Sequence, residues 1–357
     1  MINHVLEIVA RLAVLLWVTL GVGGAIAADA TMPVLAPLPA GSRPLDPHAG
    51  VTAFSFIFAG DNRPAAASCS QPPQLGEIVN AIKTSAPSFV LWGGDIIYGR
   101  DATRAADEYA QYIQIVQGAG VPIVTVPGNH EMNVKGTVEC PVPGKKHKEK
   151  KIDEPDRSGK LAAAYETAIG SPYGMFRYGN AAFIGVDTDD ALDADYDPDA
   201  CGYNGYVGKA QVQALKATLD SLSADDAVAH IFVFMHRPLH AVKSDDELGP
   251  PSVKQIGKFR ALLDPQDASH WKYPKLSIVL ASHEHLFYAY DPDAAMKDGT
   301  LTRRDPASGG PNFLVSGGAG APLANGGHFH YLTIAVNGDS VTVTYVPVDD
   351  SSSNCSQ

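Results

Sequence analysis

Short apolar runs rich in β-branched and aromatic side chains recur along the chain. They lie at 54–58, 89–92, 123–126, 183–186, 231–235, 276–280 and 313–315. Runs of this length and composition predict buried β-strands. Between several of them, apolar residues recur at helical spacing, as at 75–82 and 212–222. The alternation of strands and helices predicts an α/β fold, with a largely parallel or mixed sheet covered by helices.

The end of the chain has a different pattern. Two alternating apolar segments, 331–336 and 341–346, flank Asn-Gly-Asp at 337–339. Asn-Gly between alternating apolar segments is the strongest short hairpin signal, because both residues accept a positive φ. We therefore expect the chain to close with a C-terminal antiparallel hairpin.

The N-terminus predicts an export signal. Arg11 precedes an uncharged apolar stretch that ends in small residues, with Ala25 and Ala27 where a signal peptidase requires them. This predicts a signal peptide at 1–27, and an uncleaved membrane anchor is the alternative. Residues 28–50 are proline-rich and predict an extended linker. The folded domain is then expected at 51–350, with a tail at 351–357.

Composition restricts the class of partner. The formal net charge of −12 argues against a nucleic-acid-binding surface. After signal cleavage no stable membrane span is expected, and the protein is predicted to be periplasmic or secreted. Four cysteines without a Cys-x-x-Cys spacing favour one or two disulfides, whose pairing the sequence leaves open. The oligomeric state is also left open.

Polar residues that can bind metal ions follow the predicted strands directly. They are Asp61, Asp95, Tyr98, Asn129, His236, His283 and His285. Ligands collect outside the carboxyl ends of strands in α/β sheets, so these side chains are expected to lie together. Taken singly, each has a structural explanation such as a turn or a helix cap. Oxygen donors combined with imidazoles suit two adjacent divalent or trivalent cations.

Five segments carry these residues in a fixed order. They read Gly-Asp-Asn-Arg at 60–63, Gly-Asp-Ile-Ile-Tyr at 94–98, Gly-Asn-His-Glu at 128–131, Met-His-Arg-Pro at 235–238 and Ser-His-Glu-His at 282–285. Together they resemble the calcineurin-like metallophosphoesterase superfamily, and in motif pattern most nearly its purple acid phosphatase-like branch. The resemblance covers about residues 54–347 and implies a two-layer sandwich of mixed β-sheets flanked by helices, the metallophosphoesterase fold.

The resemblance also implies a set of ligands. Asp61, Tyr98 and His285 would hold one metal ion, Asn129, His236 and His283 would hold the second, and Asp95 would bridge them. The expected pair is Fe with Zn, Mn or a second Fe. A metal-held hydroxide would then attack phosphorus in line. His130 would stabilise or protonate the leaving group, or instead orient the attacking water.

Two arginines and a tyrosine raise questions at this site. Arg63 stands where many members of the superfamily have a histidine ligand, and a guanidinium has no lone pair to donate. Tyr98 would then complete the first metal site as a tyrosinate, or it only packs nearby. Arg63 and Arg237 would bind substrate phosphate together with Asn129, or the two arginines form ion pairs.

Two charged segments are predicted to be solvated loops. Residues 145–160 contain six lysines and one arginine, and a basic lid over the site is the alternative. Residues 187–199 contain seven aspartates, but the calcium-loop pattern fails where Pro198 replaces the required glycine.

The sequence therefore predicts an exported dinuclear metal-dependent phosphoesterase. Its substrate would be a small-molecule or lipid-linked phosphomonoester or phosphodiester. The alternative is a non-catalytic exported metal- or polyanion-binding protein that retains the fold.

Overall fold

A computed structural model of the chain describes residues 32–38, 50–140, 148–190, 204–244, 246–249, 254–264, 271–290, 300–302, 310–350 and 355. These residues belong to one compact unit, Thr31–Gln357. The predicted signal peptide at 1–27 lies outside the described residues, as does most of the predicted tail. In the described part of the chain, no helix is long and apolar enough to cross a membrane.

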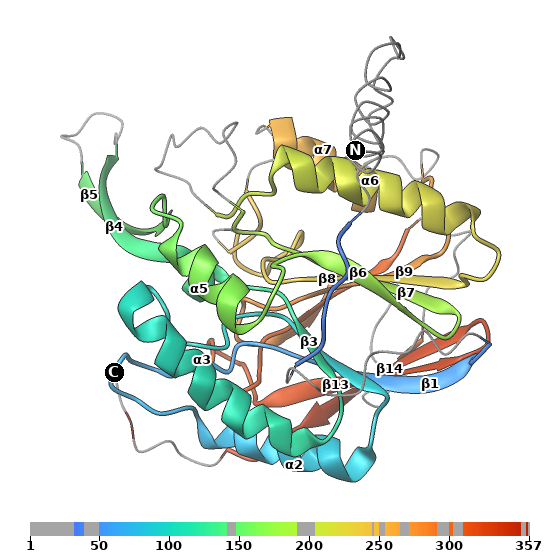
Figure 1. Ribbon diagram of the computed structural model, residues 1–357, viewed down its shortest axis with the longest axis horizontal. Coiled ribbons are helices and arrows are strands. Elements are labelled where there is room, and N and C mark those ends of the chain that lie inside the picture. Colours follow the sequence, from blue (N-terminus) through green and yellow to red (C-terminus); the bar gives the residue numbers. More distant parts are fainter. Residues whose placement is uncertain are drawn as a thin grey trace, which may run out of the picture. The chain divides into compact units, whose positions relative to one another are not determined.

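Two six-stranded sheets form the fold (Figure 1). The first has the order β11 (Thr300–Thr302), β14 (Ser340–Pro347), β13 (His330–Asn337), β1 (Ala53–Ala59), β2 (Phe89–Trp92) and β3 (Ile123–Thr125). The second has the order β10 (Phe287–Ala289), β12 (Asn312–Ser316), β9 (Leu276–Ala281), β8 (His230–Met235), β7 (Ala181–Val186) and β6 (Gly174–Tyr178). The seven predicted strands and the C-terminal hairpin, β13–β14, are confirmed.

Both sheets are mixed. Strands β1, β2 and β3 run parallel, as do β7, β8, β9 and β12. Antiparallel pairing joins β1 to β13, β13 to β14 and β14 to β11 in the first sheet, and β6 to β7 and β10 to β12 in the second. Parallel strands that are neighbours in a sheet end at the same edge, so the loops after them gather there. This places the predicted ligand-bearing loops of each sheet together.

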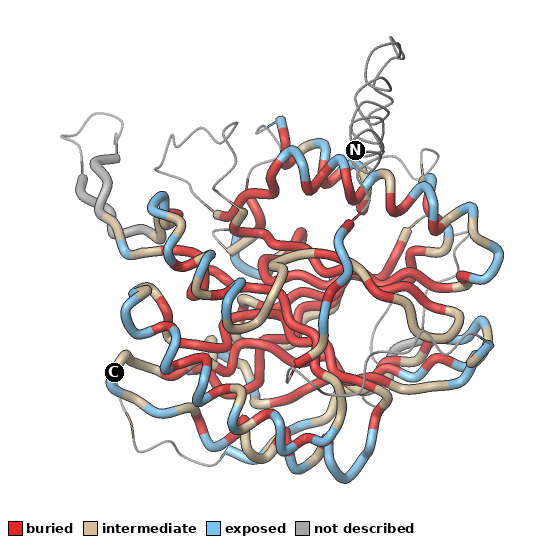
Figure 2. The backbone as a smooth tube through the Cα atoms, in the orientation of Figure 1, coloured by how far each residue is buried: buried red, intermediate tan, exposed pale blue. Residues whose placement is uncertain are grey.

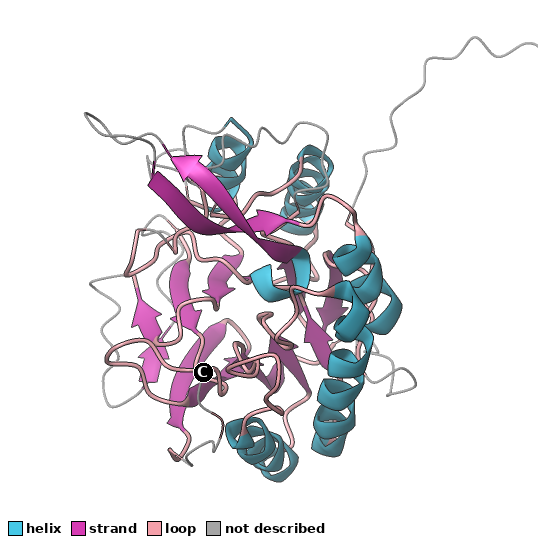
Figure 3. Cartoon of the chain, turned by 90° about the vertical axis from the view of Figure 1, so that its left-hand side faces the viewer, coloured by secondary structure: helices cyan, strands magenta, loops and turns pink. Residues whose placement is uncertain are grey.

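Helices cover the outer face of each sheet (Figures 1 and 3). The first sheet carries α2 (Pro73–Ser85), α3 (Ala102–Val116) and α5 (Lys160–Ala168), and the second carries α6 (Lys209–Ala224) and α7 (Lys254–Leu263). Helix α2 illustrates why: a proline opens it, Leu75, Ile78 and Ile82 bury one face, and Ala86 ends it in the left-handed region. Two short helices, η1 (Gln117–Ala119) and α4 (Asn129–Met132), complete the set in the described residues.

An aromatic core holds the two sheets face to face. Phe56 stacks on Phe89 at 5.3 Å between ring centroids, and Phe183 stacks on Phe232 at 5.1 Å. All four side chains are fully buried. Burying a side chain of this size contributes roughly 1.5–3 kcal/mol. Figure 2 shows the buried residues concentrated along the strands and on the inner faces of the helices.

Two segments differ from the sequence-based prediction. Residues 148–155, expected in a solvated basic loop, form strand β5 (Lys148–Pro155), which pairs antiparallel with β4 (Asn133–Cys140) in a separate ribbon (Figure 1). Within the predicted linker, residues 32–38 are docked: Leu35 N donates to Met175 O in the second sheet, and Leu38 exchanges hydrogen bonds with Ile123 in the first. Residues 148–155 read Lys-Glu-Lys-Lys-Ile-Asp-Glu-Pro and have no apolar period, so the hydrophobic pattern does not mark them as a strand.

Candidate metal centre

The predicted ligands come from loops of both sheets and meet between them. Asp61 follows β1, Asp95 follows β2 and Asn129 opens α4 after β3, while His236 follows β8 and both His283 and His285 follow β9. Backbone contacts join the two sets of loops. His283 N donates to Asp61 Oδ2 at 2.7 Å, and Nδ1 of His236 lies 2.8 Å from Gly93 O.

A serine at the sheet junction explains why two nearby positions are glycine. Ser282 stands where the resemblance predicts glycine, and it is fully buried. A Cβ added at Gly60 or at Gly93 would lie 2.1 Å from Ser282 Oγ. The serine hydroxyl donates to Ser316 O at 3.1 Å. The side chain that replaces the expected glycine therefore occupies space that two other glycines leave free, and the loops can approach closely.

In one half of the site, three acceptors face one another. A carbonyl can only accept, so His236 donates Nδ1–H to Gly93 O and its Nε2 carries a lone pair. That Nε2 lies 2.9 Å from Asn129 Oδ1 and 3.4 Å from Asp95 Oδ1, and it is 3.0 Å from His283 Nδ1. An imidazole nitrogen, an amide oxygen and a carboxylate oxygen at these distances fit a shared cation.

The other half contains an unpaired carboxylate oxygen. Asp61 Oδ1 is buried without a hydrogen-bond partner in the described protein, 3.7 Å from His285 Nε2. His285 directs its Nδ1 to Pro322 O, which leaves Nε2 bare. Asp61, Asp95 and His285 offer ligand atoms that all lie within 4.8 Å of one another. Burying an uncompensated carboxylate oxygen is costly, so the arrangement fits a cation here as well. The donor set thus fits two metal ions with Asp95 between them.

Electrostatics prepare the imidazoles to act as neutral ligands. Burial lowers the pKa of His236 below its usual value, and burial together with Arg237 lowers the pKa of His283 well below it. Burial and Arg63 lower the pKa of His285 to about 4. Burial raises the pKa of Asp95, but His236, His130 and Arg63 outweigh it and bring the pKa well below the usual value. Asp95 is therefore an anion between neutral imidazoles, as a bridging ligand must be.

Backbone strain also collects at these residues. Asp61, Asp95 and His283 have φ values of 62°, 51° and 73°, in the left-handed region that most side chains avoid. Such conformations cost on the order of 1–3 kcal/mol each and persist where the surroundings impose them, often at functional sites. Three such residues in one cluster indicate that the loop backbones are strained to bring these side chains together.

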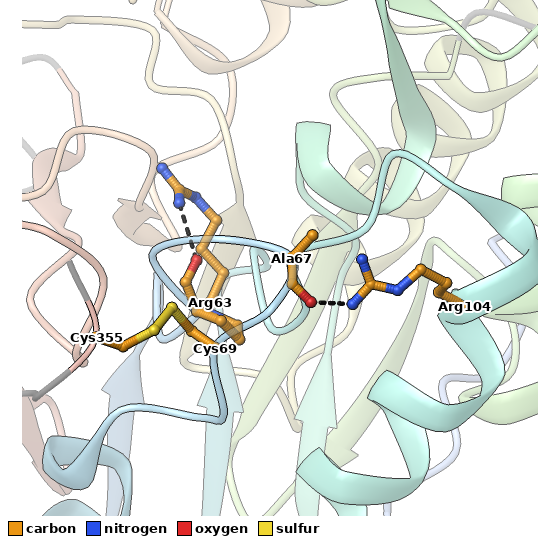
Figure 4. Close-up of a disulfide and its surroundings, with 6 residues drawn as sticks. Arg63, Ala67, Cys69, Arg104 and Cys355 are labelled. Atoms are coloured by element: carbon orange, nitrogen blue, oxygen red, sulfur yellow. Dashed lines mark hydrogen bonds between the residues drawn. A yellow bond between two sulfur atoms is a disulfide. The ribbon is translucent and has the colours of Figure 1, made fainter. Parts of the chain in front are cut away.

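Arg63 lies directly beside the predicted bridging carboxylate. Its Nε is 3.4 Å from Asp95 Oδ2, and its side chain is 14% exposed. Nη1 donates to Pro64 O at 3.2 Å. The loop that carries Arg63 is fastened by a disulfide between Cys69 and Cys355, and Arg104 donates to Ala67 O from α3 (Figure 4). The second pair of cysteines, Cys140 and Cys201, lies where the structure describes no side chains.

Arg237 is held in a buried ion pair. Its Nε lies 3.0 Å from both carboxylate oxygens of Asp189, and Nη1 donates to His283 Nε2 at 3.1 Å. Asp189 also accepts from Asn133 Nδ2 at 2.7 Å. Asp187 and Asp189 are both buried, so the expectation of a solvated loop is wrong for these two residues, while 191–199 lies outside the described residues. For Arg237 the geometry favours the ion-pair alternative over substrate binding.

His130 and Tyr98 form a pair next to Asp95. The Nδ1 of His130 donates to the Tyr98 carbonyl, and Nε2 lies 3.9 Å from Asp95 Oδ2. Their rings meet edge to face with centroids 5.7 Å apart. Burial lowers the pKa of His130 well below its usual value, so the ring is neutral with Nε2 as the acceptor. Coordination by the Tyr98 phenol oxygen stays a prediction.

Two glutamates hold the ligand loops together, and sequence reasoning found only part of their role. Glu131 accepts from Gly128 N of its own loop and from Asp95, Ile96 and Ile97 N of the neighbouring loop. Glu284, between two predicted ligands, accepts from Val242 N and Lys243 N. The acidic residue within each motif was visible in the sequence, but its partners were not.

Comparison with known proteins gives a family and a fold. The sequence model of the calcineurin-like phosphoesterase family matches residues 46–287. The structure is similar to a purple acid phosphatase, PPD1, from yellow lupin (Lupinus luteus) seeds, with TM-score 0.55 and 16% identity over 84% of this chain and 52% of that one. It is also similar to a dimetal phosphatase from Danio rerio, with TM-score 0.51 and 15% identity over 83% of this chain and 97% of that one.

At these identities the two likenesses establish the fold alone. The chain spans about half the length of the lupin protein. No curated protein sequence matches this chain significantly.

Proposed function

Because the chain belongs to the calcineurin-like phosphoesterase family, we propose that it is an exported, dinuclear metal-dependent phosphoesterase. The observation that carries the proposal is the convergence of acceptors around Asp95. His236 Nε2 and Asn129 Oδ1 approach one of its sides, while Asp61 and His285 lie on the other. Cations between mutually facing acceptors would offset the cost of burying those acceptors unpaired.

Asp61, His285 and Tyr98 would hold one metal ion, and Asn129, His236 and His283 the other, with Asp95 shared. When bound, two such cations activate water and neutralise charge on a transferring phosphoryl group. The Fe-containing pairs predicted from the motif pattern belong to this proposal. So does the tyrosinate.

The remaining side chains would handle phosphate and protons. Arg63, partly exposed beside Asp95, would bind a phosphate oxygen through its guanidinium. His130, whose Nε2 faces the same carboxylate, would stabilise or protonate the leaving group or instead orient the attacking water. Asn129 would contact both substrate and metal. The substrate is a phosphomonoester or phosphodiester of a small molecule or a lipid-linked group.

Export to the periplasm or medium is part of the proposal. The Cys69–Cys355 disulfide supports it, because disulfides persist in oxidising compartments. Fractionation of cells that express the full chain tests it: we expect a processed protein outside the cytoplasm, starting at residue 28. A full-length cytoplasmic protein would contradict export and leave the hydrolase proposal in place.

Metal content and hydrolysis test the reaction together. Protein dialysed against Zn²⁺ or Fe is analysed by elemental emission, and hydrolysis of 4-nitrophenyl phosphate and bis(4-nitrophenyl) phosphate is measured. We expect two metal ions per chain and turnover of at least one ester. Asp95→Asn and His236→Ala should lower kcat/KM by at least about 100-fold.

Asp107→Asn is the matched control, because that aspartate is exposed on α3. It should retain full activity and both metal ions. Fewer than one tightly bound ion and no hydrolysis would contradict the proposal. Two bound ions without hydrolysis of either ester would instead identify a non-catalytic metal-binding protein that retains the fold.

A further inference from the structure

In the described part of the β4–β5 ribbon, the carboxylate of Asp153 contacts a predicted metal ligand. Asp153 in β5 accepts from Asn129 Nδ2 at 2.8 Å, across 24 residues of sequence. The ribbon begins immediately after α4, the helix that Asn129 opens. A segment inserted directly behind a predicted ligand thus folds back onto it.

Asp153 itself is firmly held by cations. Arg100 donates Nη1 and Nη2 to its two carboxylate oxygens at 2.7 and 2.8 Å, and Lys135 Nζ lies 2.7 Å from Oδ1. The side chains of Arg100 and Asp153 are 7% and 19% exposed, whereas Lys135 is 62% exposed. A carboxylate paired in this way is ionised and can only accept hydrogen bonds.

This fixes which way the Asn129 amide faces. Because Asp153 can only accept, Asn129 must present its NH₂ group there and its Oδ1 on the opposite side, toward His236 Nε2 at 2.9 Å. Without a cation, that orientation sets an amide oxygen against a lone pair. An amide turned by 180° would set its Oδ1 against the Asp153 carboxylate, which can only accept.

We infer that Asp153 is a positioning residue that keeps the Asn129 amide in its metal-binding orientation. Through this contact the β4–β5 ribbon becomes a structural support of the second metal site. The inference rests on the proposed function for the identity of that site. The contact itself is independent of the reaction.

The first test measures Zn²⁺ affinity by calorimetric titration of the metal-free full chain, with Zn²⁺ alone as the probe. Asp153→Ala should weaken the second Zn²⁺ by about 10–100-fold, as is typical when the partner of a metal ligand is lost, and leave the first within about twofold. Asp153→Ser, too short to reach Asn129, carries the same expectation if the alanine variant does not fold.

Two control variants separate orientation from anchoring of the ribbon. Arg100→Gln and Lys135→Gln remove ion pairs of Asp153 but leave its carboxylate next to Asn129. Both should bind the second Zn²⁺ within about threefold of the wild-type affinity. Equal weakening in Arg100→Gln and Asp153→Ala would overturn the inference, because anchoring alone would then explain the loss. Unchanged affinity in Asp153→Ala would also overturn it.

The second test needs no metal. In ¹⁵N-labelled metal-free protein, the side-chain NH₂ signals of Asn129 are assigned by their loss in Asn129→Asp. They should shift in Asp153→Ala and stay in place in Lys135→Gln. Unshifted signals in Asp153→Ala would overturn the inference. If the wild-type chain binds fewer than two Zn²⁺ ions, the proposed function fails, and the amide signals still decide the role of Asp153.

Discussion

Replacing Glu131 by glutamine is the sharpest test of how the two ligand loops are joined. Four backbone N–H groups converge on this fully buried carboxylate. Oε1 accepts from Ile96 and Ile97 at 3.0 and 3.1 Å, and Oε2 accepts from Asp95 and Gly128 at 2.8 and 2.6 Å. Glutamine has nearly the same shape but offers one oxygen and one NH₂ group.

The expected loss of stability follows from the equal sharing of the four N–H donors, two to each carboxylate oxygen. Whichever way the glutamine amide turns, two of the four N–H donors face an NH₂ group and lose their acceptor. A buried polar group without a partner costs about 1–3 kcal/mol. Glu131→Gln should therefore lower the free energy of unfolding by about 2–6 kcal/mol. It should weaken metal binding as well, because the loops of Asp95 and Asn129 lose their shared acceptor.

Urea unfolding followed by circular dichroism, with EDTA present so that metal binding does not contribute, measures the change. Glu166→Gln is the matched control, since this glutamate is exposed on α5 and should change stability by less than about 0.5 kcal/mol. A loss for Glu131→Gln no larger than for the control would refute the reasoning.

Three further predictions concern stability and colour. Burial lowers the pKa of His330 to about 4 from 6.5, so the unfolded chain binds this proton more tightly and the folded state loses stability as the pH is lowered. Between pH 7.5 and pH 4.5 the wild type should lose about 2–3 kcal/mol more than His330→Phe in urea titrations, and equal losses would contradict this. The Cys69–Cys355 disulfide closes a separation of 286 residues, so the double serine variant should be about 2–5 kcal/mol less stable toward urea, whereas an unchanged midpoint would count against it. Iron-loaded protein should show a visible tyrosinate charge-transfer band that Tyr98→Phe abolishes; a colourless, active iron protein would rule the tyrosinate out.

The strands, and the candidate ligands at their ends, could be predicted because their signals are local. An apolar run such as 231–235 reports burial residue by residue, and the polar residue that ends it falls at the carboxyl edge of a parallel strand. The C-terminal hairpin could be predicted for the same reason, although its two turn residues are Gly338 and Asp339, while Asn337 pairs with Ser340. The absence of a lone pair on Arg63 also follows from residue type alone.

The ribbon and the buried aspartates could not be predicted in the same way. Residues 148–155 carry charges on both faces of a two-stranded ribbon, so no apolar period marks the strand. Asp189 lies in a run of aspartates that composition assigns to solvent, yet it is buried in an ion pair with Arg237, 48 residues away. Whether a buried charge is compensated depends on the residue it pairs with and not on its neighbours in sequence.

By itself the sequence determined which donors this protein can offer to a metal and at which strand ends they stand, because side-chain chemistry and strand periodicity are properties of short segments. Only the tertiary structure decided how those donors are oriented: the carboxylate that turns Asn129, the glutamate that joins two loops and the cysteine that fastens the Arg63 loop. Contacts across 24, 36 and 286 residues are selected by packing, since the entropy of closing a loop changes only slowly with its length.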